Sequence, residues 1–245
     1  MGALVWITGA SSGIGAALVR TLPWSDAEVI GVARRAPSGC AHLPADLATE
    51  EGWAVLARDV AARVAGGSQS RVVLVHAAGS LDPVGFAREV DPAAYTRNVL
   101  LNAAAPQVIG QAFLAATAGL PLRRDLVLLT SGAAHTVYPG WSSYGAGKAA
   151  VDQWCRTAGA EEAARDGAVV LAVAPGVVAT AMQERLRATP EASFPARERF
   201  VRFHEQGRLA DPDEVAARIW GVVDAGFASG SVLDLRDLPP PGAAP

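Results

Sequence analysis

The chain has 245 residues, of which 51% are hydrophobic and 18% are charged, and its formal net charge is −3. This composition suits one globular domain with a substantial core, and the scattered Lys and Arg residues give no basic patch for nucleic acid or an anionic membrane. The two cysteines have no metal-ligand spacing, so we expect small-molecule chemistry at a site without a metal.

The N-terminal residues give no sign of export or membrane insertion. Residues 1–13 lack a basic segment, and their apolar run is only a few residues long, whereas a membrane span needs about 20. The sequence therefore predicts a cytoplasmic protein that is not bound to a membrane.

Short apolar runs recur along the chain and predict buried strands. They are rich in Val, Ile and Leu without strict alternation, as expected of parallel strands that are covered on both faces. Stretches with helical spacing separate them, which predicts a single-domain α/β fold: a doubly wound parallel sheet with helices on both faces. We expect this domain to span residues 1–238, before a Pro-rich tail at 239–245. The predicted strands cover residues 3–8, 28–33, 71–78, 125–131 and 168–175.

A glycine-rich segment, residues 8–15 (TGASSGIG), follows the first predicted strand and opens a predicted helix. Gly9, Gly13 and Gly15 let the backbone turn sharply and approach a pyrophosphate at the positive N-terminal end of a helix. A tight turn without a ligand can use the same glycines. Because this segment joins a strand to a helix, it predicts a dinucleotide-binding loop.

Two arginines, Arg34 and Arg35, follow the second predicted strand, and no acidic residue stands there. A carboxylate at this place binds the ribose hydroxyls of NAD, whereas an arginine pairs with the additional phosphate of NADP. A hydroxyl from Ser11 or Ser12 can donate to the same phosphate. The pattern favours NADP(H), and the alternative is a pair of solvated arginines at the end of a strand.

Tyr144 and Lys148 stand four residues apart at the start of a predicted helix, so their side chains share one face. Lowering the pKa of a tyrosine from about 10 to ~7 needs roughly 4 kcal/mol, and an ammonium about 4 Å away at an effective dielectric of ~20 supplies ~4 kcal/mol. Lys148, helped by the positive nicotinamide ring of an oxidised cofactor, can therefore turn Tyr144 into an acid–base catalyst. The alternative is an exposed pair on a helix surface.

Residues 181–210 are more charged than the rest and contain two prolines between two segments that can form short amphipathic helices. Excursions at the carboxyl ends of strands cover ligands in many α/β proteins, so we expect this one to cover the substrate. Phe194 and Phe200 can line the substrate pocket or fill the core. The expected pocket residues are Ala133, Tyr138, Trp141 and Met182.

These motifs, in this order, resemble the short-chain dehydrogenase/reductase family over almost the whole chain. Residues 8–15 resemble its cofactor loop, Asp46 and Leu47 its adenine-contacting pair, and residues 175–180 (PGVVAT) the segment that lines the nicotinamide. The resemblance implies a Rossmann-type fold and an NADP(H)-dependent oxidoreductase. The ending, residues 228–237 (ASGSVLDLRD), is more similar to the sepiapterin reductase and benzil reductase branch, which reduces ketones next to a second carbonyl or a pterin side chain.

The family resemblance also implies a role for each matching residue. Ser131 lies 13 residues before Tyr144, the family's usual interval, and is expected to bind the substrate oxygen. Tyr144 is the expected acid in reduction and base in oxidation, and Lys148 also holds the nicotinamide ribose. The expected cofactor contacts are Gly9, Ser11, Ser12, Gly13, Ile14, Gly15, Arg34, Arg35, Asp46, Leu47, Ala77, Ala78, Gly79, Tyr144, Lys148, Pro175, Gly176, Val178 and Thr180.

One motif departs from the family pattern and another leaves a choice. The family's NNAG is HAAG here, residues 76–79, so the backbone can approach the cofactor although the Asn side-chain bonds are absent. We expect His76 to be a core or strand-end residue and not a base. The Asn that orders a relay water is Asn98 or Asn102, and the small residues and proline after Asn102 favour the latter.

The sequence as a whole predicts an NADPH-dependent carbonyl reductase that acts on an uncharged or weakly polar ketone or diketone. The alternatives are an alcohol dehydrogenase that works oxidatively and a regulatory protein that binds NADP without turnover. The family resemblance implies a homodimer or homotetramer. Its contacts would involve Ala-rich helices at residues 92–118 and 143–165, which otherwise expose an apolar stripe.

Overall fold

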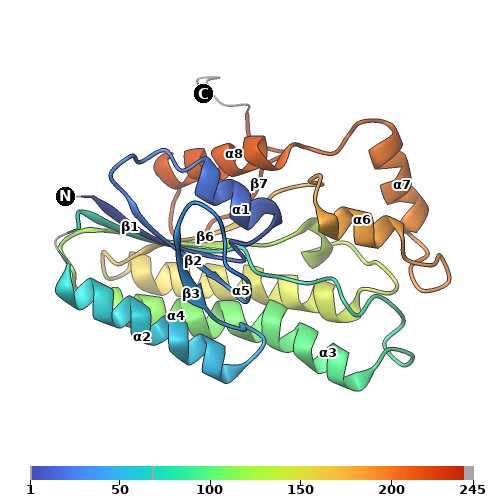
Figure 1. Ribbon diagram of the computed structural model, residues 1–245, viewed down its shortest axis with the longest axis horizontal. Coiled ribbons are helices and arrows are strands. Elements are labelled where there is room, and N and C mark those ends of the chain that lie inside the picture. Colours follow the sequence, from blue (N-terminus) through green and yellow to red (C-terminus); the bar gives the residue numbers. More distant parts are fainter. Residues whose placement is uncertain (1, 68, 240–245) are drawn as a thin grey trace.

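The computed structural model describes residues 2–67 and 69–239, which fold around one parallel sheet (Figure 1). The described residues form seven strands in the order β3-β2-β1-β4-β5-β6-β7, with helices on both faces. This arrangement confirms the predicted fold class. All of the predicted tail except Pro239 lies outside the described residues. The strands are β1 (Ala3–Thr8), β2 (Glu28–Ala33), β3 (Ala41–Pro44), β4 (Arg71–His76), β5 (Arg123–Leu129), β6 (Val169–Ala174) and β7 (Val232–Asp234).

The helices divide into two layers around the sheet. Helices α1 and α8 cover one face, and α2, α4 and α5 cover the other (Figure 1). A π-helical turn, η1 (Leu100–Ala104), joins α3 to α4, and a 3₁₀ turn, η2 (Gly132–Ala134), precedes α5. The helices are α1 (Gly13–Arg20), α2 (Glu50–Gly66), α3 (Pro92–Val99), α4 (Ala105–Thr117), α5 (Ser142–Ala163), α6 (Ala181–Arg187), α7 (Arg197–Glu205) and α8 (Pro212–Asp224).

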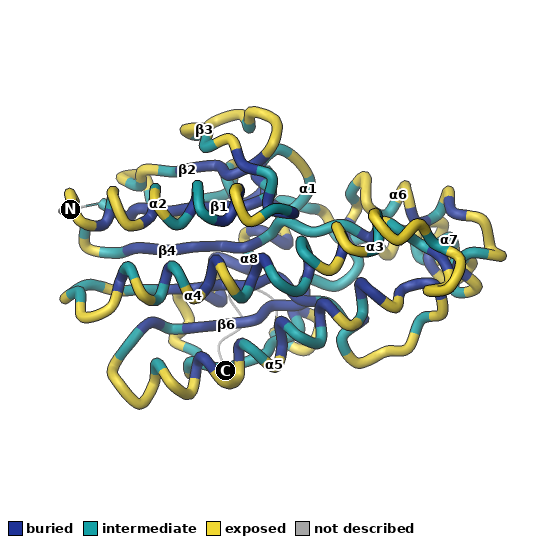
Figure 2. The backbone as a smooth tube through the Cα atoms, turned by 90° about the horizontal axis from the view of Figure 1, so that it is seen from below, coloured by how far each residue is buried: buried dark blue, intermediate teal, exposed yellow. Residues whose placement is uncertain are grey.

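The central strands are apolar on both sides because each side meets a layer of helices. Along β1, Val5 and Ile7 belong to the core under α1 and α8, whereas Leu4 and Trp6 belong to the core under α2, α4 and α5. Figure 2 shows β1, β4 and β6 as largely buried between helices whose outer faces are exposed. This two-sided burial explains the continuous apolar runs in the sequence.

The predicted strand bounds agree closely with the observed ones, but two strands were not predicted. The first two predicted strands have the same bounds as β1 and β2, and the other three differ from β4, β5 and β6 by one or two residues at an end. Strand β3 is a mostly exposed edge strand, and β7 has only three residues, all half-buried. Neither strand carries the apolar run that predicts a buried one.

Helix starts differ in a way that matters for the site. Helix α2 follows Thr49 and α3 follows Asp91, and each of these side chains accepts a hydrogen bond from a backbone N–H of the first turn. Ser12, before α1, makes no such bond. The N-terminal N–H groups of α1 therefore lack a side-chain cap and can bind an anion.

The helical stretch Pro92–Thr117 is long and apolar enough to cross a membrane by length and composition, with a mean hydropathy of 1.4 and 33% of that window buried. It is weak evidence for a span, because a core helix of a soluble protein passes the same test. Here one side of the stretch packs against the sheet, α2 and α5, and the other side exposes Val99 and Val108.

Helices α6 and α7 form an extension at the end of the sheet where the strands finish (Figure 1). They pack with the segment before α5 around a third, aromatic core that is separate from the two cores of the sheet. This aromatic core comprises Leu81, Ala133, Trp141, Tyr144, Leu186, Phe194 and Phe200. The extension thus adjoins the carboxyl ends of the strands, where ligands bind in open α/β folds.

Candidate active site

The loop between β1 and α1 is built so closely that several positions require glycine. Gly9 has a φ of +69°, and a Cβ there would lie 3.0 Å from the Ala78 backbone. A Cβ on Gly15 would lie 2.3 Å from the Gly9 carbonyl oxygen. Together with the uncapped start of α1, this loop forms a cradle of backbone N–H groups that fits a dinucleotide pyrophosphate.

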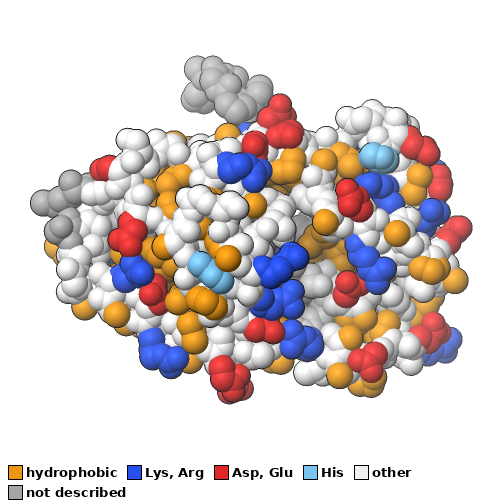
Figure 3. Space-filling model, viewed as in Figure 1, with side chains coloured by type: hydrophobic (Ala, Val, Ile, Leu, Met, Phe, Trp, Pro, Cys, Tyr) orange, Lys and Arg blue, Asp and Glu red, His pale blue; other side chains and the backbone are white. Residues whose placement is uncertain are grey.

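A cavity of about 310 Å³ lies beside this loop, at the ends of β2 and β3. Arg34 and Arg35 both line it and are exposed, as a contact with a phosphate in solvent requires. In Figure 3, basic side chains gather beside a hollow on this face of the molecule. Predicted residues that line the cavity are Gly9, Ser11, Ser12, Arg34, Arg35, Asp46, Leu47, Ala78 and Gly79.

Asp46 is held in place by partners that the sequence did not reveal. Its carboxylate accepts hydrogen bonds from the Ala48 backbone N–H at 3.1 Å and from Arg97 at 2.9 Å. Burial pushes the pKa of Asp46 upward, but the bonds from Arg97 and Ala48 outweigh it and leave the pKa below its usual value. Arg97, from α3, also lines this cavity. Its partner lies 51 residues away in the chain, so no local motif pointed to it.

His76 ends β4 as a buried residue, next to the cofactor loop. Its Nδ1 lies 3.2 Å from the Thr8 hydroxyl, and that hydroxyl accepts a hydrogen bond of 3.0 Å from the Ala78 backbone N–H. Burial, assisted by the charge of Lys148, lowers the pKa of His76 to about 3, so the imidazole is neutral. The pair of Thr8 and His76 thus holds the HAAG segment without the Asn side chain.

Both candidate asparagines are buried and bind the backbone that follows this segment. Asn98 donates to the carbonyls of Ser80 and Asp82, whereas Asn102 donates to the Ser80 carbonyl at 2.8 Å and accepts from its N–H at 3.2 Å. A Cβ on Gly79 would lie 3.0 Å from Asn102 Oδ1 and 3.7 Å from Lys148 Nζ. Asn102 is therefore close to Lys148, and its role in ordering a water stays a prediction.

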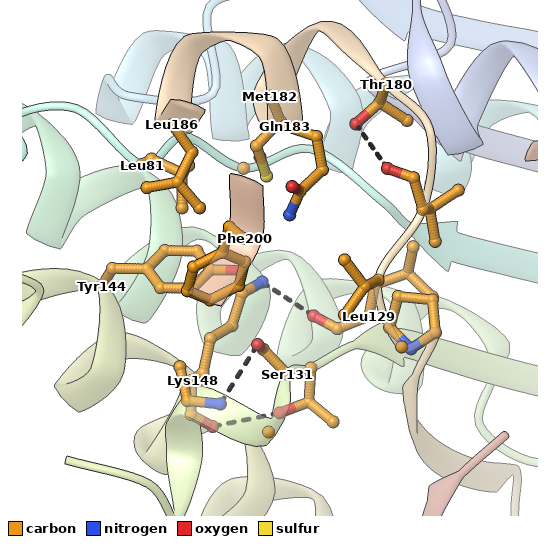
Figure 4. Close-up of a pocket in the computed structure, with 18 of the residues that line it drawn as sticks. Leu81, Leu129, Ser131, Tyr144, Lys148, Thr180, Met182, Gln183, Leu186 and Phe200 are labelled. Carbon is orange, nitrogen blue, oxygen red and sulfur yellow. Dashed lines mark hydrogen bonds between the residues drawn. The ribbon is translucent and has the colours of Figure 1, made fainter. Parts of the chain in front are cut away.

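A second cavity, of about 190 Å³, brings Ser131, Tyr144 and Lys148 together (Figure 4). Ser131 comes just after β5, whereas Tyr144 and Lys148 lie one turn apart on α5, as predicted. The Ser131 hydroxyl accepts a hydrogen bond of 3.2 Å from the Ala133 backbone N–H and is near enough to the Tyr144 hydroxyl to act on its pKa. Lys148 Nζ donates to the Leu129 carbonyl at 2.8 Å and lies 5.7 Å from the centre of the Tyr144 ring.

Burial shifts the pKa values of both Tyr144 and Lys148. Burial raises the pKa of Tyr144, although the hydrogen bond with Ser131 opposes this shift. Burial also lowers the pKa of Lys148 to about 8, and the charge of Asp152 acts against that change. That Lys148, helped by the positive nicotinamide ring of the oxidised cofactor, brings the tyrosine pKa to ~7 stays a prediction, and the cost of burying a phenolate acts against it.

The side of this cavity that was predicted to bind the substrate is aromatic. Trp141 stacks on Phe194 with ring centres 4.6 Å apart, and Tyr138 and Phe200 contact the same pair. Phe200 lines the cavity, but Phe194 is fully buried behind it and fills the core. The four predicted pocket residues, Ala133, Tyr138, Trp141 and Met182, all line the cavity.

Most of the other predicted residues lie at one of the two cavities. Residues Ile14, Ala77, Gly79, Pro175, Gly176, Val178 and Thr180 line the smaller one, whereas Gly13, Gly15 and Asn102 line neither. The predicted excursion contributes further lining residues that were not singled out, namely Gln183, Leu186, Arg199 and Phe203. The lining residues outside the segments predicted to line the substrate or the nicotinamide are Leu81, Leu129, Thr130, Gly132 and Arg236. The sequence pattern gave no sign of which of these residues face the cavity.

Comparisons of the sequence and of the structure with known proteins agree on the family. The model of the short chain dehydrogenase family matches residues 3–191. Benzil reductase ((S)-benzoin forming) of Bacillus subtilis (strain 168) is 32% identical over 170 residues, which is 69% of this chain and 70% of that protein. Sepiapterin reductase of Meriones unguiculatus is 30% identical over 256 residues, covering 94% of this chain and 95% of that protein. The crystal structure of a short chain dehydrogenase/reductase from Saccharomyces cerevisiae superposes with a TM-score of 0.78 at 25% identity, covering 95% and 96% of the two chains.

Proposed function

The chain belongs to the short-chain dehydrogenase/reductase family of oxidoreductases, and from that premise we propose that it reduces a ketone or diketone to a secondary alcohol with NADP(H). This proposal rests on the position of Ser131, Tyr144 and Lys148 in the smaller cavity, next to the larger cavity that arginines line. The similarity to a protein named benzil reductase supports a substrate with two adjacent carbonyl groups.

When bound, the reduced nicotinamide supplies the hydride that adds to the carbonyl carbon. Ser131 would donate a hydrogen bond to the carbonyl oxygen, and Tyr144 would donate its proton as negative charge develops there. The raised pKa of Tyr144 suits a proton donor, because the phenol keeps its proton at neutral pH until the reaction takes it. Lys148, with its pKa of about 8, is largely protonated at pH 7 and would stabilise the tyrosinate left behind.

The other cavity fits the adenosine half of the cofactor. Residues of the β1–α1 loop would hold the pyrophosphate, and Thr180 with the preceding segment would line the nicotinamide. Arg34 and Arg35 would pair with the additional phosphate of NADP, assisted by Ser11 or Ser12. In this proposal Asn102 orders the water through which Tyr144 regains its proton.

We further propose that residues 1–238 act as one domain whose segment 181–210 covers the substrate, and that the chain forms a homodimer or homotetramer. Val99 and Val108 are 39% and 42% exposed on the outer side of the α3–α4 stretch, which favours burial against a second copy. Light scattering coupled to size-exclusion chromatography tests this, and a monomer at micromolar concentration would contradict it.

The function is tested by following NADPH and NADH oxidation with a panel of aryl diketones, quinones, pterin side-chain ketones and simple aldehydes. We expect turnover of diketones with a preference for NADPH. Turnover with NADH alone would contradict the assignment of the arginines. Tight NADPH binding without turnover of any carbonyl would favour a protein that senses the cofactor.

A further inference from the structure

The charged side chains that line the smaller cavity are all positive. They are Lys148, Arg199 and Arg236, and no Asp or Glu of the described chain lines this cavity. The proposed mechanism uses Lys148, but it gives no role to the two arginines. A pocket for an uncharged ketone does not need them, since hydrogen bonds and apolar contacts suffice there.

Arg236 is placed against the catalytic end of the cavity. Its Nη2 lies 3.4 Å from the position of a Cβ on Gly132, the residue directly after Ser131. Its Cγ and Cδ lie 3.5 Å from the corresponding position on Gly176. The aliphatic part of Arg236 therefore lies over Gly176, in the segment expected to line the nicotinamide, and its guanidinium lies over Gly132, beside the serine expected to bind the substrate oxygen.

Asp234 orients this guanidinium without occupying all of it. Its carboxylate accepts from Arg236 Nε at 2.9 Å and from Nη2 at 2.5 Å, and also from the Arg236 backbone N–H at 2.9 Å. A guanidinium has five N–H donors, so these bonds leave the Nη1 edge for a ligand. The bond with Asp234 raises the pKa of Arg236, and the nearby charge of Asp237 acts in the same direction, so the group stays cationic.

Arg199 adds a second positive charge from α7. Its Nη1 donates to the Tyr138 hydroxyl at 3.1 Å, and its guanidinium lies 5.4 Å from the Phe203 ring centre. Arg236 also lies within electrostatic range of Tyr138. Asp152 near Lys148, and Asp234 and Asp237 near Arg236, balance the three positive charges, but of these six groups only the cations line the cavity and can contact a ligand there.

We propose that the substrate is a 2-oxo acid with an aryl or alkyl substituent, and that Arg236 binds its carboxylate. A carboxylate bonded to the reacting carbonyl carbon would reach the guanidinium over Gly132 while Ser131 and Tyr144 hold the carbonyl oxygen. Planar, two-bond recognition of carboxylate is what arginine provides best. Figure 4 shows Leu81 and Leu186 on the side of the cavity away from Ser131, where the apolar substituent would lie.

This inference rests on the proposed function and narrows it, because the sequence alone suggested an uncharged substrate. The reaction balances as a two-electron reduction. NADPH gives a hydride to the carbonyl carbon, Tyr144 gives a proton to the oxygen, and the products are a 2-hydroxy acid and NADP⁺. The carboxylate is unchanged.

The test compares benzoylformate with its methyl ester, which differ by one negative charge, at pH 7 in the wild type and in Arg236→Gln. We expect the wild type to have a kcat/KM for the acid at least tenfold above that for the ester. In Arg236→Gln, kcat/KM for the acid should fall by roughly tenfold to hundredfold, as expected for a lost charge-assisted pair, and that for the ester by less than threefold. Arg202→Gln is the matched control, because Arg202 lies on α7, pairs with Glu198 and does not line the cavity.

The outcomes separate this inference from the function on which it rests. Efficient reduction of the ester and of diketones without preference for the acid would overturn the carboxylate site and leave the reductase in place. Equal losses on acid and ester in Arg236→Gln would make Arg236 a structural residue and would overturn its role. If Arg236→Gln does not fold, the carboxylate site is tested by Arg236→Lys and by the ratio of kcat/KM for the acid to that for the ester in the wild type. No reduction of any ketone would refute the proposed function itself.

Discussion

The two cavities meet at Gly79 but differ in one wall. The larger cavity, which is proposed for the cofactor and which we call the cofactor side, adjoins a loop of consecutive residues in which Gly9 and Gly15 leave little room for a Cβ. The substrate side is shaped by side chains such as Leu81, Phe200 and Arg236, which come from segments far apart in the chain.

This difference separates what the fold must keep from what it can change. A backbone cradle recognises phosphate, which every dinucleotide carries, and one added methyl group damages it. A wall of side chains can be rebuilt by substitution without moving a strand. Substrate choice is therefore expected to depend on the extension of α6 and α7 and on the chain after β7. Cofactor binding is expected to depend on the loops at the carboxyl ends of the strands.

The strongest test of this separation is Tyr144→Phe, which removes one hydroxyl from the substrate side. We expect kcat for ketone reduction to fall by roughly 10²- to 10⁴-fold, the usual contribution of a positioned general acid. The dissociation constant of NADPH, measured by fluorescence titration, should change by less than about threefold if the two sides are independent.

Tyr95→Phe is the matched control for this variant. The Tyr95 hydroxyl lies 3.3 Å from the Ser142 hydroxyl, outside both cavities, so turnover should be unchanged. A loss of NADPH affinity in Tyr144→Phe as large as its loss of turnover would show that the two sides are not separable.

The next largest effect is on the free energy of unfolding, which the burial of Lys148 on the substrate side lowers near neutral pH. Lys148 has a pKa of about 8 in the folded chain, against 10.5 for an ordinary lysine. Between these values the unfolded chain binds more protons, so the free energy of unfolding rises with pH, by at most about 3 kcal/mol from this group.

Urea unfolding at pH 7.5 and pH 10 measures this dependence, with Lys148→Met as the comparison. The wild type should gain about 2 kcal/mol relative to Lys148→Met between the two values, because methionine does not titrate. Tyr144, whose pKa burial raises, would reduce stability only above its ordinary pKa, so pH 10 is a suitable upper limit. A difference between the two proteins that is independent of pH would contradict the low lysine pKa.

The same contrast explains how much of the site the sequence could predict. The glycine loop and the pair of Tyr144 and Lys148 are local patterns, and the structure brings the pair to one cavity. Arg97 and Arg236 reach the cavities only when strands and helices far apart in the sequence pack together. No local sequence pattern could therefore predict them as site residues. The burial that raises the pKa of Tyr144 was not predicted either, because a pairwise estimate contains no term for burial.

The fold shows the same limit. Strands buried on both faces were predicted within two residues, since their composition reflects contact with two helical layers. Strand β7 and edge strand β3 were missed because hydrogen bonding to a neighbour, and not an apolar run, defines them. A strand that is buried on both faces therefore has a more distinctive amino-acid composition than a strand at the edge of the sheet.

A smaller effect tests the backbone side. Gly15→Ala would place a Cβ 2.3 Å from the Gly9 carbonyl oxygen, so the loop must shift. We expect the free energy of unfolding to fall by roughly 1–3 kcal/mol, as for overpacking in a core, and NADPH to bind more weakly.

Gly221→Ala, on α8, is the control for this change, since a Cβ there meets nothing within 4 Å. It should stabilise the protein by about 0.5–1 kcal/mol, the usual advantage of alanine over glycine in a helix. Urea unfolding of the two variants at one pH compares them directly. If both variants gain stability, the loop is not the rigid cradle that the contrast requires.

The smallest expected effect concerns the two exposed arginines on the cofactor side. Arg34 and Arg35 are exposed, so their pairing with a phosphate is weakened by solvent. We expect the ratio of kcat/KM for NADPH to that for NADH to fall by roughly tenfold in the double variant Arg34→Ala/Arg35→Ala, and to stay unchanged in Arg58→Ala on α2. The single variants distinguish a phosphate contact from a general effect of charge: a fall in only one of them assigns the contact, whereas equal small falls indicate long-range attraction, which added salt would remove. If the ratio stays constant in the double variant, the arginines are a solvated pair and NADP(H) preference must come from elsewhere.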